Sequence, residues 1–289
     1  MATPANDFPT RYGPWALIAG GSEGIGRSFA GALAARGLRL VLTARRAEVL
    51  EQSAAEIRAR HGVEVATHAV DLTAPDLAQR LDAIVGAREI GLLVYNAGAT
   101  HGAELFLEQP VENALNLVRL NCLGPLLLAH RLGRAMRDRG RGGVILMSSM
   151  AGLVGAGYVA TYAATKAFDT ALAESLWFEL RGAGVDVLGL IAGATQTPAM
   201  ARSGAAFGGP TARDAGPQGE LPNLDAMSPD EVAREALEHL GSGPTWIAGA
   251  KNREAAAGLR AAPREEVIQA MSAASAQLFS KPFPPYSKR

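Results

Sequence analysis

The pentapeptide YAATK, from Tyr162 to Lys166, carries a phenol and an ammonium four residues apart. On a helix, side chains at this spacing lie on one face. An ammonium beside a phenol stabilises the phenolate, so Tyr162 could give or take a proton near neutral pH. The pattern is common by chance, and a surface pair is the alternative interpretation. Because the pair follows MSSMAG, at the end of a predicted strand, the sequence favours an acid–base site at the carboxyl edge of a sheet.

A second stretch, AGGSEGIG at residues 19–26, fits two kinds of chemistry. Gly20-x-Ser22-x-Gly24 matches the turn that exposes a nucleophilic serine in α/β-hydrolases. The glycines also match a turn that holds a dinucleotide phosphate against a helix N-terminus. A hydrolase serine normally follows several strands, whereas Ser22 follows the first, and the single late histidine, His239, lies in an amphipathic helical pattern. The sequence therefore favours a dinucleotide site and leaves a serine hydrolase using Ser22 as a distant alternative.

Short apolar runs rich in β-branched residues alternate along the chain with longer Ala- and Leu-rich stretches at helical spacing. Most of the short runs lack polar–apolar alternation, as expected for strands covered by helices on both faces. We therefore predict an α/β fold, a single domain with a doubly wound, mostly parallel seven-stranded sheet and helices on both faces. The predicted strands begin at Trp15, Arg39, Val63, Leu92, Gly143, Val185 and Thr245.

Three regions are predicted along the chain. Residues 1–12 form an N-terminal arm, residues 13–250 the sheet domain, and residues 251–289 a helical extension that ends in a Pro-rich tail. Within the sheet domain, the segment 199–227 is rich in Gly, Ala and Pro, lacks periodicity and is too long for an ordinary connection. We expect this segment to be a substrate lid. Its large apolar side chains are Met200, Phe207, Leu221 and Leu224.

Composition argues against several classes of protein. The 28 basic and 28 acidic side chains among 289 residues give no net charge, which argues against nucleic acid as a partner. Cys122 is the single cysteine, so an intramolecular disulfide is impossible, and the five histidines lack metal-ligand spacing. No stretch approaches the roughly 18 apolar residues of a membrane span. We expect a cytoplasmic protein without a bound metal, a membrane span or a nucleic-acid partner.

Taken together and in chain order, the motifs make the sequence resemble the short-chain dehydrogenase/reductase family over roughly residues 12–250. AGGSEGIG stands where the family has T-G-x-x-x-G-I-G, YAATK supplies its Tyr-x-x-x-Lys, and ILMSSMAG is similar to its catalytic-serine strand. The family's Asn-Ala-Gly and late Pro-Gly-x-x-x-Thr are matched by NAG at residues 96–98 and AGATQT at residues 192–197. The resemblance implies a Rossmann-type fold.

The start YGPWALIAGGSEGIG, together with TARRAEVLE and MSPDEVAREALEHL, is similar to one branch of that family, which contains 3-oxoacyl and 17β-hydroxysteroid reductase-like enzymes. This similarity implies a hydrophobic or lipid-like carbonyl substrate, without selecting one.

The resemblance implies catalytic roles for four residues. Tyr162 exchanges the proton of the substrate oxygen, and Ser149, rather than Ser148, hydrogen-bonds that oxygen. Lys166 stabilises the phenolate and contacts the nicotinamide ribose. Asn121, in RLNCLG, matches the asparagine that holds a water in the proton relay to the lysine. Taken alone, Ser149 could instead form a local turn and Asn121 a buried cap.

The choice of cofactor rests on the end of the second predicted strand, VLTARR. Where NAD-preferring members of the family carry an aspartate, this chain has Ala44, followed by Arg45 and Arg46. Guanidinium groups suit a 2′-phosphate and the repelling carboxylate is absent, so NADP(H) is favoured. The resemblance further implies that Asp71 contacts adenine and that Thr197 contacts the nicotinamide carboxamide. The predicted cofactor site comprises Gly20, Ser22, Gly24, Ile25, Gly26, Arg45, Arg46, Asp71, Leu72, Asn96, Ala97, Gly98, Tyr162, Lys166, Gly193, Thr195 and Thr197.

The leading functional hypothesis is an NADP-dependent oxidoreductase that transfers hydride between the nicotinamide and a carbonyl or secondary alcohol. The alternative is a nucleotide-binding sensor or assembly subunit with little turnover, although the intact Ser149, Tyr162 and Lys166 argue against it. The resemblance also implies a homodimer or homotetramer, with the helices that contain Asn121 and Tyr162 at the interface.

Overall fold

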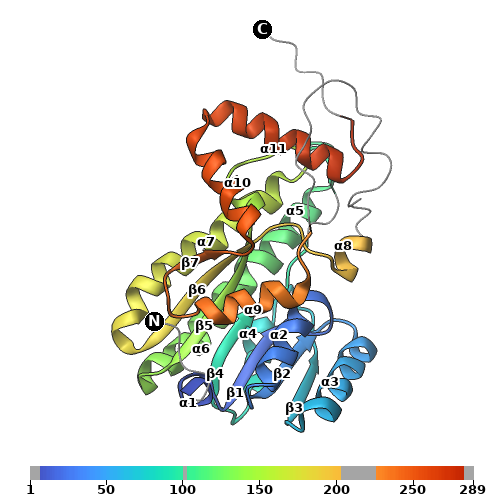
Figure 1. Ribbon diagram of the computed structural model, residues 1–289. Helices are drawn as coiled ribbons and strands as arrows, with labels where there is room; N and C mark the ends of the chain where they lie inside the picture. The colour runs from blue at the N-terminus through green and yellow to red at the C-terminus, as the bar shows by residue number, and fades with distance from the viewer. Residues whose placement is uncertain (1–6, 100–102, 203–225, 283–289) are drawn as a thin grey trace.

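The computed structural model describes residues 7–99, 103–202 and 226–282. Seven parallel strands form one sheet in the order β3-β2-β1-β4-β5-β6-β7 (Figure 1). The strands are β1 (Trp15–Ala19), β2 (Arg39–Ala44), β3 (Val65–Ala69), β4 (Ile90–Tyr95), β5 (Gly142–Ser149), β6 (Val185–Ala192) and β7 (Thr245–Ile247). The strand order reverses between β1 and β4, which is where open α/β sheets bind ligands. The predicted doubly wound fold is confirmed.

Burial on both faces explains why the strand sequences are continuously apolar. Every residue of β1 and β4 is buried, and so is every residue of β5 except the last. The structure corrects three predicted strand starts: β3 begins at Val65 rather than Val63, β4 at Ile90 rather than Leu92, and β5 at Gly142 rather than Gly143. Strand β4 ends at Tyr95, before the NAG motif. The amides of Asn96 and Ala97 both bond to the carbonyl oxygen of Ala19. The chain therefore turns at Asn96 and leaves the sheet beside the end of β1.

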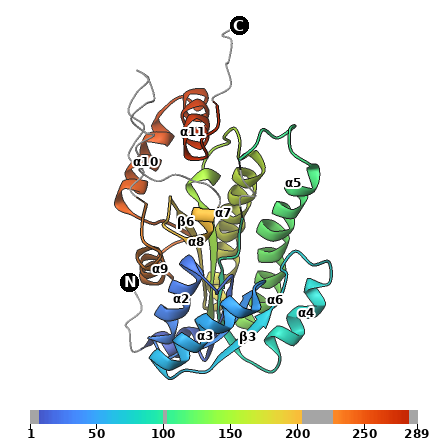
Figure 2. The ribbon, with the colours of Figure 1, turned by 90° about the vertical axis from the view of Figure 1, so that its right-hand side faces the viewer.

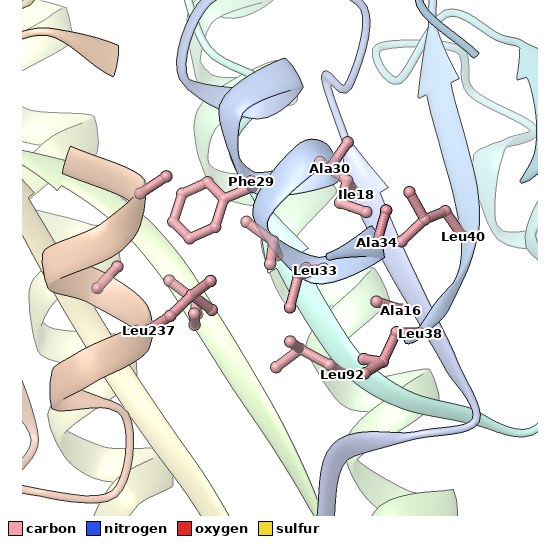
Figure 3. Close-up of a cluster of buried hydrophobic side chains, with 14 of the residues drawn as sticks. Ala16, Ile18, Phe29, Ala30, Leu33, Ala34, Leu38, Leu40, Leu92 and Leu237 are labelled. Carbon is pink, nitrogen blue, oxygen red and sulfur yellow. The ribbon is translucent and has the colours of Figure 1, made fainter. Parts of the chain in front are cut away.

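Helices cover both faces of the sheet (Figure 2). One face carries α2 (Gly24–Ala34), α3 (Ala47–His61) and α9 (Pro229–His239), and the other carries α4 (Leu77–Val85), α5 (Val111–Val118), α6 (Gly124–Arg139) and α7 (Ala160–Leu180). Figure 3 shows Phe29 and Leu33 of α2 in a buried cluster with Ile18 of β1 and Leu237 of α9. These two apolar layers hold the strand ends that carry the sequence motifs.

The first described helix, α1 (Phe8–Tyr12), belongs to the core although the sequence places it in an N-terminal arm. Phe8 and Tyr12 are buried, and the hydroxyl of Tyr12 donates a hydrogen bond to Asp186 at 2.6 Å. Arg11 forms an ion pair with the same carboxylate at 2.6 Å. This cluster fixes α1 against the start of β6, at the edge of the sheet opposite the strand ends that carry the motifs.

The C-terminal extension forms two helices, α10 (Ala250–Ala261) and α11 (Arg264–Leu278), separated at Pro263 (Figure 1). Ser272 of α11 accepts a hydrogen bond from the amide of Gly157 at 2.8 Å. Ala276 packs in a small apolar cluster with residues of the segment between β5 and α7, and Tyr162 is packed against this cluster. The extension therefore lies directly beside the predicted catalytic tyrosine.

None of the helices in the described ranges is long and apolar enough to cross a bilayer. The expected cytoplasmic location stays a prediction.

Candidate active site

A cavity of about 840 Å³ lies at the carboxyl ends of the strands, where the glycine turn, the NAG motif and the end of β5 meet. It brings together nearly all the residues that the sequence singles out. The predicted residues on its wall are Gly20, Ser22, Gly24, Ile25, Arg45, Arg46, Asp71, Leu72, Asn96, Ala97, Gly98, Ser149, Tyr162, Lys166, Gly193, Thr195 and Thr197. Gly26 and Asn121 are not on the wall and lie behind it, as described below.

The glycine turn packs so tightly that a side chain would not fit at Gly20 or at Gly26. Gly20 has φ +82°, and a Cβ there would come within 2.9 Å of the Cα of Ala97. A Cβ on Gly26 would overlap the carbonyl oxygen of Gly20, which also accepts a hydrogen bond from the side-chain amide of Asn96 at 2.9 Å. Helix α2 begins at Gly24, so its N-terminal amides lie at the cavity wall. This is a cradle for an anionic group such as a pyrophosphate.

Ser148 and Ser149 end β5 but differ in their surroundings. Ser148 is buried, and its hydroxyl lies 2.7 Å from both the carbonyl oxygen of Lys166 and the hydroxyl of Thr170. Ser149 is partly exposed, and its oxygen accepts a hydrogen bond from the amide of Ala151 at 3.2 Å. That contact is the local turn considered as an alternative, yet it leaves the Ser149 hydroxyl able to donate to a ligand in the cavity.

Tyr162 and Lys166 both reach the cavity from α7. The ammonium nitrogen lies 5.9 Å from the centre of the Tyr162 ring. It donates hydrogen bonds to the carbonyl oxygen of Met147 at 2.7 Å and to Oδ2 of Asp169 at 2.9 Å. Burial alone would lower the pKa of Lys166, but the charges of Asp169 and Tyr162 outweigh it and the pKa is raised. The lysine is therefore an ammonium at neutral pH.

Asp169 is a residue of this site that the sequence motifs do not reveal. Its side chain is 3% exposed, and burial raises its pKa to about 6 although the neighbouring Lys166 lowers it. It follows Lys166 by three residues, so helical spacing alone could have placed it on the same face. A carboxylate at helical spacing from Lys166 is the sequence signal that could have revealed it.

Asn121 lies behind the wall in a π-helical turn, Arg119–Leu123, and is fully buried. Its side-chain amide donates to the hydroxyl of Thr165 at 3.0 Å, while its Oδ1 has no hydrogen-bond partner in the described part of the chain. A Cβ on Gly98 would come 3.5 Å from both Oδ1 and the nitrogen of Lys166. A buried acceptor without a protein partner suits a bound water, and π-turns of this kind are frequent at functional sites.

The adenosine end of the predicted site carries a cluster of charges. Arg45 and Arg46 are both exposed on the cavity wall. Glu23, in the glycine turn, accepts a hydrogen bond from Arg46 at 2.6 Å and pairs also with Arg202. Burial would raise the pKa of Glu23, but Arg202 and Arg46 outweigh it and the pKa is lowered. Sequence reasoning missed Glu23 because it occupies a variable position of the glycine pattern.

Asp71, predicted to contact adenine, lies on the wall beside Arg45. Its Oδ1 accepts hydrogen bonds from the amide and the hydroxyl of Thr73 at 2.9 and 2.8 Å. The amide of Thr73 is the largest cause that lowers the pKa of Asp71. These bonds keep Asp71 ionised and orient its carboxylate at the cavity.

The first described end of the predicted lid lies on the cavity wall, and the second lies beside a wall residue, Thr195. The short helix α8 (Pro198–Arg202) contributes Met200 to the wall, and the amide of Met200 donates to the hydroxyl of Thr197 at 3.1 Å. Met227 returns beside Thr195 in an isolated parallel bridge. Phe207, Leu221 and Leu224 lie outside the described residues, and the lid stays a prediction.

The distant hydrolase hypothesis finds no support in this arrangement. His239 is stacked on Trp246 and does not line the cavity, and none of the described wall residues is a histidine. The wall therefore offers Ser22 no histidine as the base that a serine hydrolase of this kind needs. Within residues 7–99, 103–202 and 226–282, no three or more His, Cys, Asp or Glu side chains gather as a metal site would require.

The chain is similar to known dehydrogenases over most of its length. The family described as short chain dehydrogenase matches residues 14–206. A 7beta-hydroxysteroid dehydrogenase of Collinsella aerofaciens is 33% identical over 244 residues, which are 84% of this chain and 89% of the relative. A solved structure concerned with 7beta-hydroxysteroid dehydrogenase stereoselectivity has a TM-score of 0.81 and 31% identity, covering 91% of this chain and 98% of that chain.

A short-chain dehydrogenase from Sphingobium yanoikuyae in complex with NADPH has a TM-score of 0.71 and 30% identity, covering 86% of this chain and 93% of that chain. The family match spans every residue of the cavity wall and the strands β1 to β6. The predicted resemblance is confirmed, and the chain belongs to the short-chain dehydrogenase family of oxidoreductases.

Proposed function

We propose that this enzyme is an NADP-dependent oxidoreductase that interconverts a ketone and a secondary alcohol on a hydrophobic, lipid-like molecule. The main support for the proposal is that one cavity is lined by Ser149, Tyr162 and Lys166 together with the glycine turn. A sensor that only binds nucleotide has no need of this acid–base set. The set therefore favours turnover over the alternative of a binding subunit.

The described residues fit a nicotinamide dinucleotide along the cavity. The cradle formed by Gly20, Gly24 and Gly26 would hold the pyrophosphate, and Arg45 and Arg46 would face a 2′-phosphate at the adenosine end. At the other end, Thr197 and Lys166 would hold the carboxamide and the ribose. The bound nicotinamide would supply or accept the hydride.

The residues of the chain would manage the oxygen and its proton. The Tyr162 hydroxyl would donate its proton to the carbonyl oxygen during reduction, and the Tyr162 phenolate would accept the alcohol proton during oxidation. Ser149 would donate a hydrogen bond to the same oxygen and stabilise the charge that develops there. The ammonium of Lys166, 5.9 Å from the ring centre, would stabilise the phenolate that results. Asn121 would hold a water behind Lys166 from which the proton is replaced.

The surroundings of Tyr162 support a hydrophobic substrate. An apolar cluster that includes Tyr158, Val159 and Ala276 packs beside the tyrosine, and Met271 and Phe279 of the C-terminal region lie against it. The relative from Collinsella aerofaciens is named for a steroid substrate, which agrees with a bulky apolar ligand. A panel of ketones, followed through NADPH oxidation, tests this. We expect higher kcat/KM for bulky ketones than for acetone-sized ones, and the reverse order would contradict the proposal.

The preference for NADP can be tested at Arg45. Replacing Arg45 with Ala should weaken NADPH binding by roughly tenfold to a hundredfold, since hydrogen bonds to charged groups contribute on the order of 1.5–3 kcal/mol, and should barely affect NADH. Arg45 is a cleaner choice than Arg46, which is paired with Glu23. Fluorescence titration measures both affinities. Arg58→Ala, on α3 but off the cavity wall, is the control, and equal affinity of the unaltered enzyme for NADH and NADPH would contradict the assignment.

We also propose that the enzyme self-associates through α5, α6 and α7, as the family resemblance implies. Large apolar side chains are exposed along these helices and the turn between α5 and α6. They are Val111, Leu115, Val118, Leu123, Leu126 and Phe178. We expect the enzyme to sediment as a dimer or tetramer and Leu115→Asp to shift it towards monomer, because a buried charge opposes association. Ile268→Asp, at an exposed apolar position of α11, should leave the sedimentation unchanged. A monomeric unaltered enzyme would refute the interface.

A further inference from the structure

Asp169 is a buried carboxylate for which the mechanism above has no use. It lies three residues after Lys166 on α7, and its side chain is 3% exposed, against 6% for the lysine. Its Oδ2 accepts the hydrogen bond from the lysine at 2.9 Å, while its Oδ1 is buried without a hydrogen-bond partner among the described residues. Burying a carboxylate is costly unless it is paired. Its place in the fold is therefore tied to Lys166.

The ammonium of Lys166 is held by two acceptors on its buried side. An ammonium has three N–H donors. One of them goes to the carbonyl oxygen of Met147 on β5 at 2.7 Å, and another goes to Asp169 on α7 at 2.9 Å. The nitrogen is thereby fixed between sheet and helix. Because Lys166 also lines the cavity, its remaining donor is available to a ligand there.

We propose that Asp169 is a positioning residue that aims the ammonium of Lys166 into the cavity and offsets part of its positive charge beside Tyr162. The carboxylate would weaken the attraction between the ammonium and the phenolate, so it would set the pH range in which the tyrosine exchanges its proton. The inference rests on the proposed function, because Lys166 needs an orientation only if it serves a bound cofactor and substrate.

The ionisable groups that face Asp169 come from its own helix and from two other elements. They are Lys166 on α7, Cys122 in the π-helical turn and Tyr95 on β4, and Tyr162 faces the lysine in turn. Burial and then the charge of Asp169 raise the pKa of Cys122 to about 11, and the same causes raise the pKa of Tyr95. With its own pKa raised to about 6 by burial, Asp169 is the member of this group that changes charge in mild acid.

Two substitutions separate orientation from charge. Asp169→Asn keeps an acceptor for the lysine but removes the negative charge, whereas Asp169→Leu removes both. The control is Asp186→Asn, which alters another largely buried carboxylate that is paired with Arg11 at the opposite edge of the sheet. For each enzyme we would measure thermal unfolding, the KM for NADP(H), and the pH profile of kcat for alcohol oxidation.

For Asp169→Asn we expect an unchanged KM for the cofactor, because the ammonium is still held by two acceptors. The rising limb of its kcat–pH profile should move about one pH unit towards acid, because the phenolate then faces the Lys166 ammonium without the offsetting charge of Asp169. For Asp169→Leu we expect the KM to rise about tenfold, in line with one lost hydrogen bond to a charged group. Asp186→Asn should lower the unfolding temperature without moving the profile.

A profile in Asp169→Asn that superposes on that of the unaltered enzyme would overturn the inference, and so would an equal rise of KM in the Asn and Leu variants. If the unaltered enzyme transfers no hydride at all, the proposed function fails instead. Should neither variant fold, the Asp169 carboxyl carbon can be titrated by NMR in the unaltered enzyme. The inference requires the chemical shift of this carbon to change when NADPH binds, and an unchanged chemical shift would overturn the inference.

Discussion

Tyr162→Phe is expected to remove nearly all turnover while leaving NADPH affinity almost unchanged. The ring would still pack against the apolar cluster beside α11, so only the proton donor is lost. General acid–base groups contribute roughly 10²- to 10⁴-fold to rate, and we expect a loss of kcat within or above this range. Steady-state kinetics with a bulky ketone, together with a fluorescence titration of NADPH, measures both quantities.

Tyr158→Phe is the matched control for that substitution. Tyr158 is buried in the same cluster but does not line the cavity, and its hydroxyl donates to the carbonyl oxygen of Pro282. Its loss should cost some stability and leave kcat within a few-fold. Near-normal turnover in Tyr162→Phe would exclude Tyr162 from the mechanism, whatever the control shows.

Lys166→Ala should damage turnover, cofactor binding and stability together. Without the ammonium the phenolate of Tyr162 is not stabilised, so we expect kcat to fall at least about a hundredfold. The lost contact to the ribose should weaken NADPH about tenfold. The substitution also leaves the carboxylate of Asp169 buried without its partner, which costs roughly 3–5 kcal/mol in comparable pairs.

The double variant Lys166→Ala/Asp169→Asn separates these effects. It removes the stranded charge, so the unfolding temperature should recover part of its loss while kcat and NADPH affinity stay low. Recovery of turnover in the double variant would show that Lys166 acts only by neutralising Asp169, and the assigned role in catalysis would be wrong.

The sequence predicts the fold well because its signals are local. Glycine turns, buried apolar strands and helical spacing each depend on a few neighbouring residues, and their order along the chain agrees with one doubly wound sheet. The convergence of Ser149, Tyr162 and Lys166 follows from the same rule, since the carboxyl ends of parallel strands share one edge. In the structure these three residues do share one cavity wall.

The charges around the site could not be predicted in the same way. Glu23 and Asp169 acquire their significance from partners that pack against them, Arg202 from α8 and Lys166 beside Met147. Helical spacing places Asp169 on the face of Lys166, but neither its burial nor the pairing of Glu23 with Arg202 is encoded in a short pattern, because both depend on how the helices dock on the sheet. The motifs also do not show whether a residue lines the cavity or lies behind its wall. Gly26 and Asn121 belong to motifs, yet both lie behind the wall and support it from there.

The most direct test of the central claim follows a labelled hydride. The enzyme would be incubated with a bulky hydrophobic ketone and NADPH that carries deuterium at the transferable position of its nicotinamide. We predict an alcohol with deuterium on the carbinol carbon, formed by the unaltered enzyme and nearly absent with Tyr162→Phe, although both bind NADPH. Tight NADPH binding without any deuterated alcohol, across a panel of large and small ketones, would contradict the account and favour a nucleotide-binding sensor.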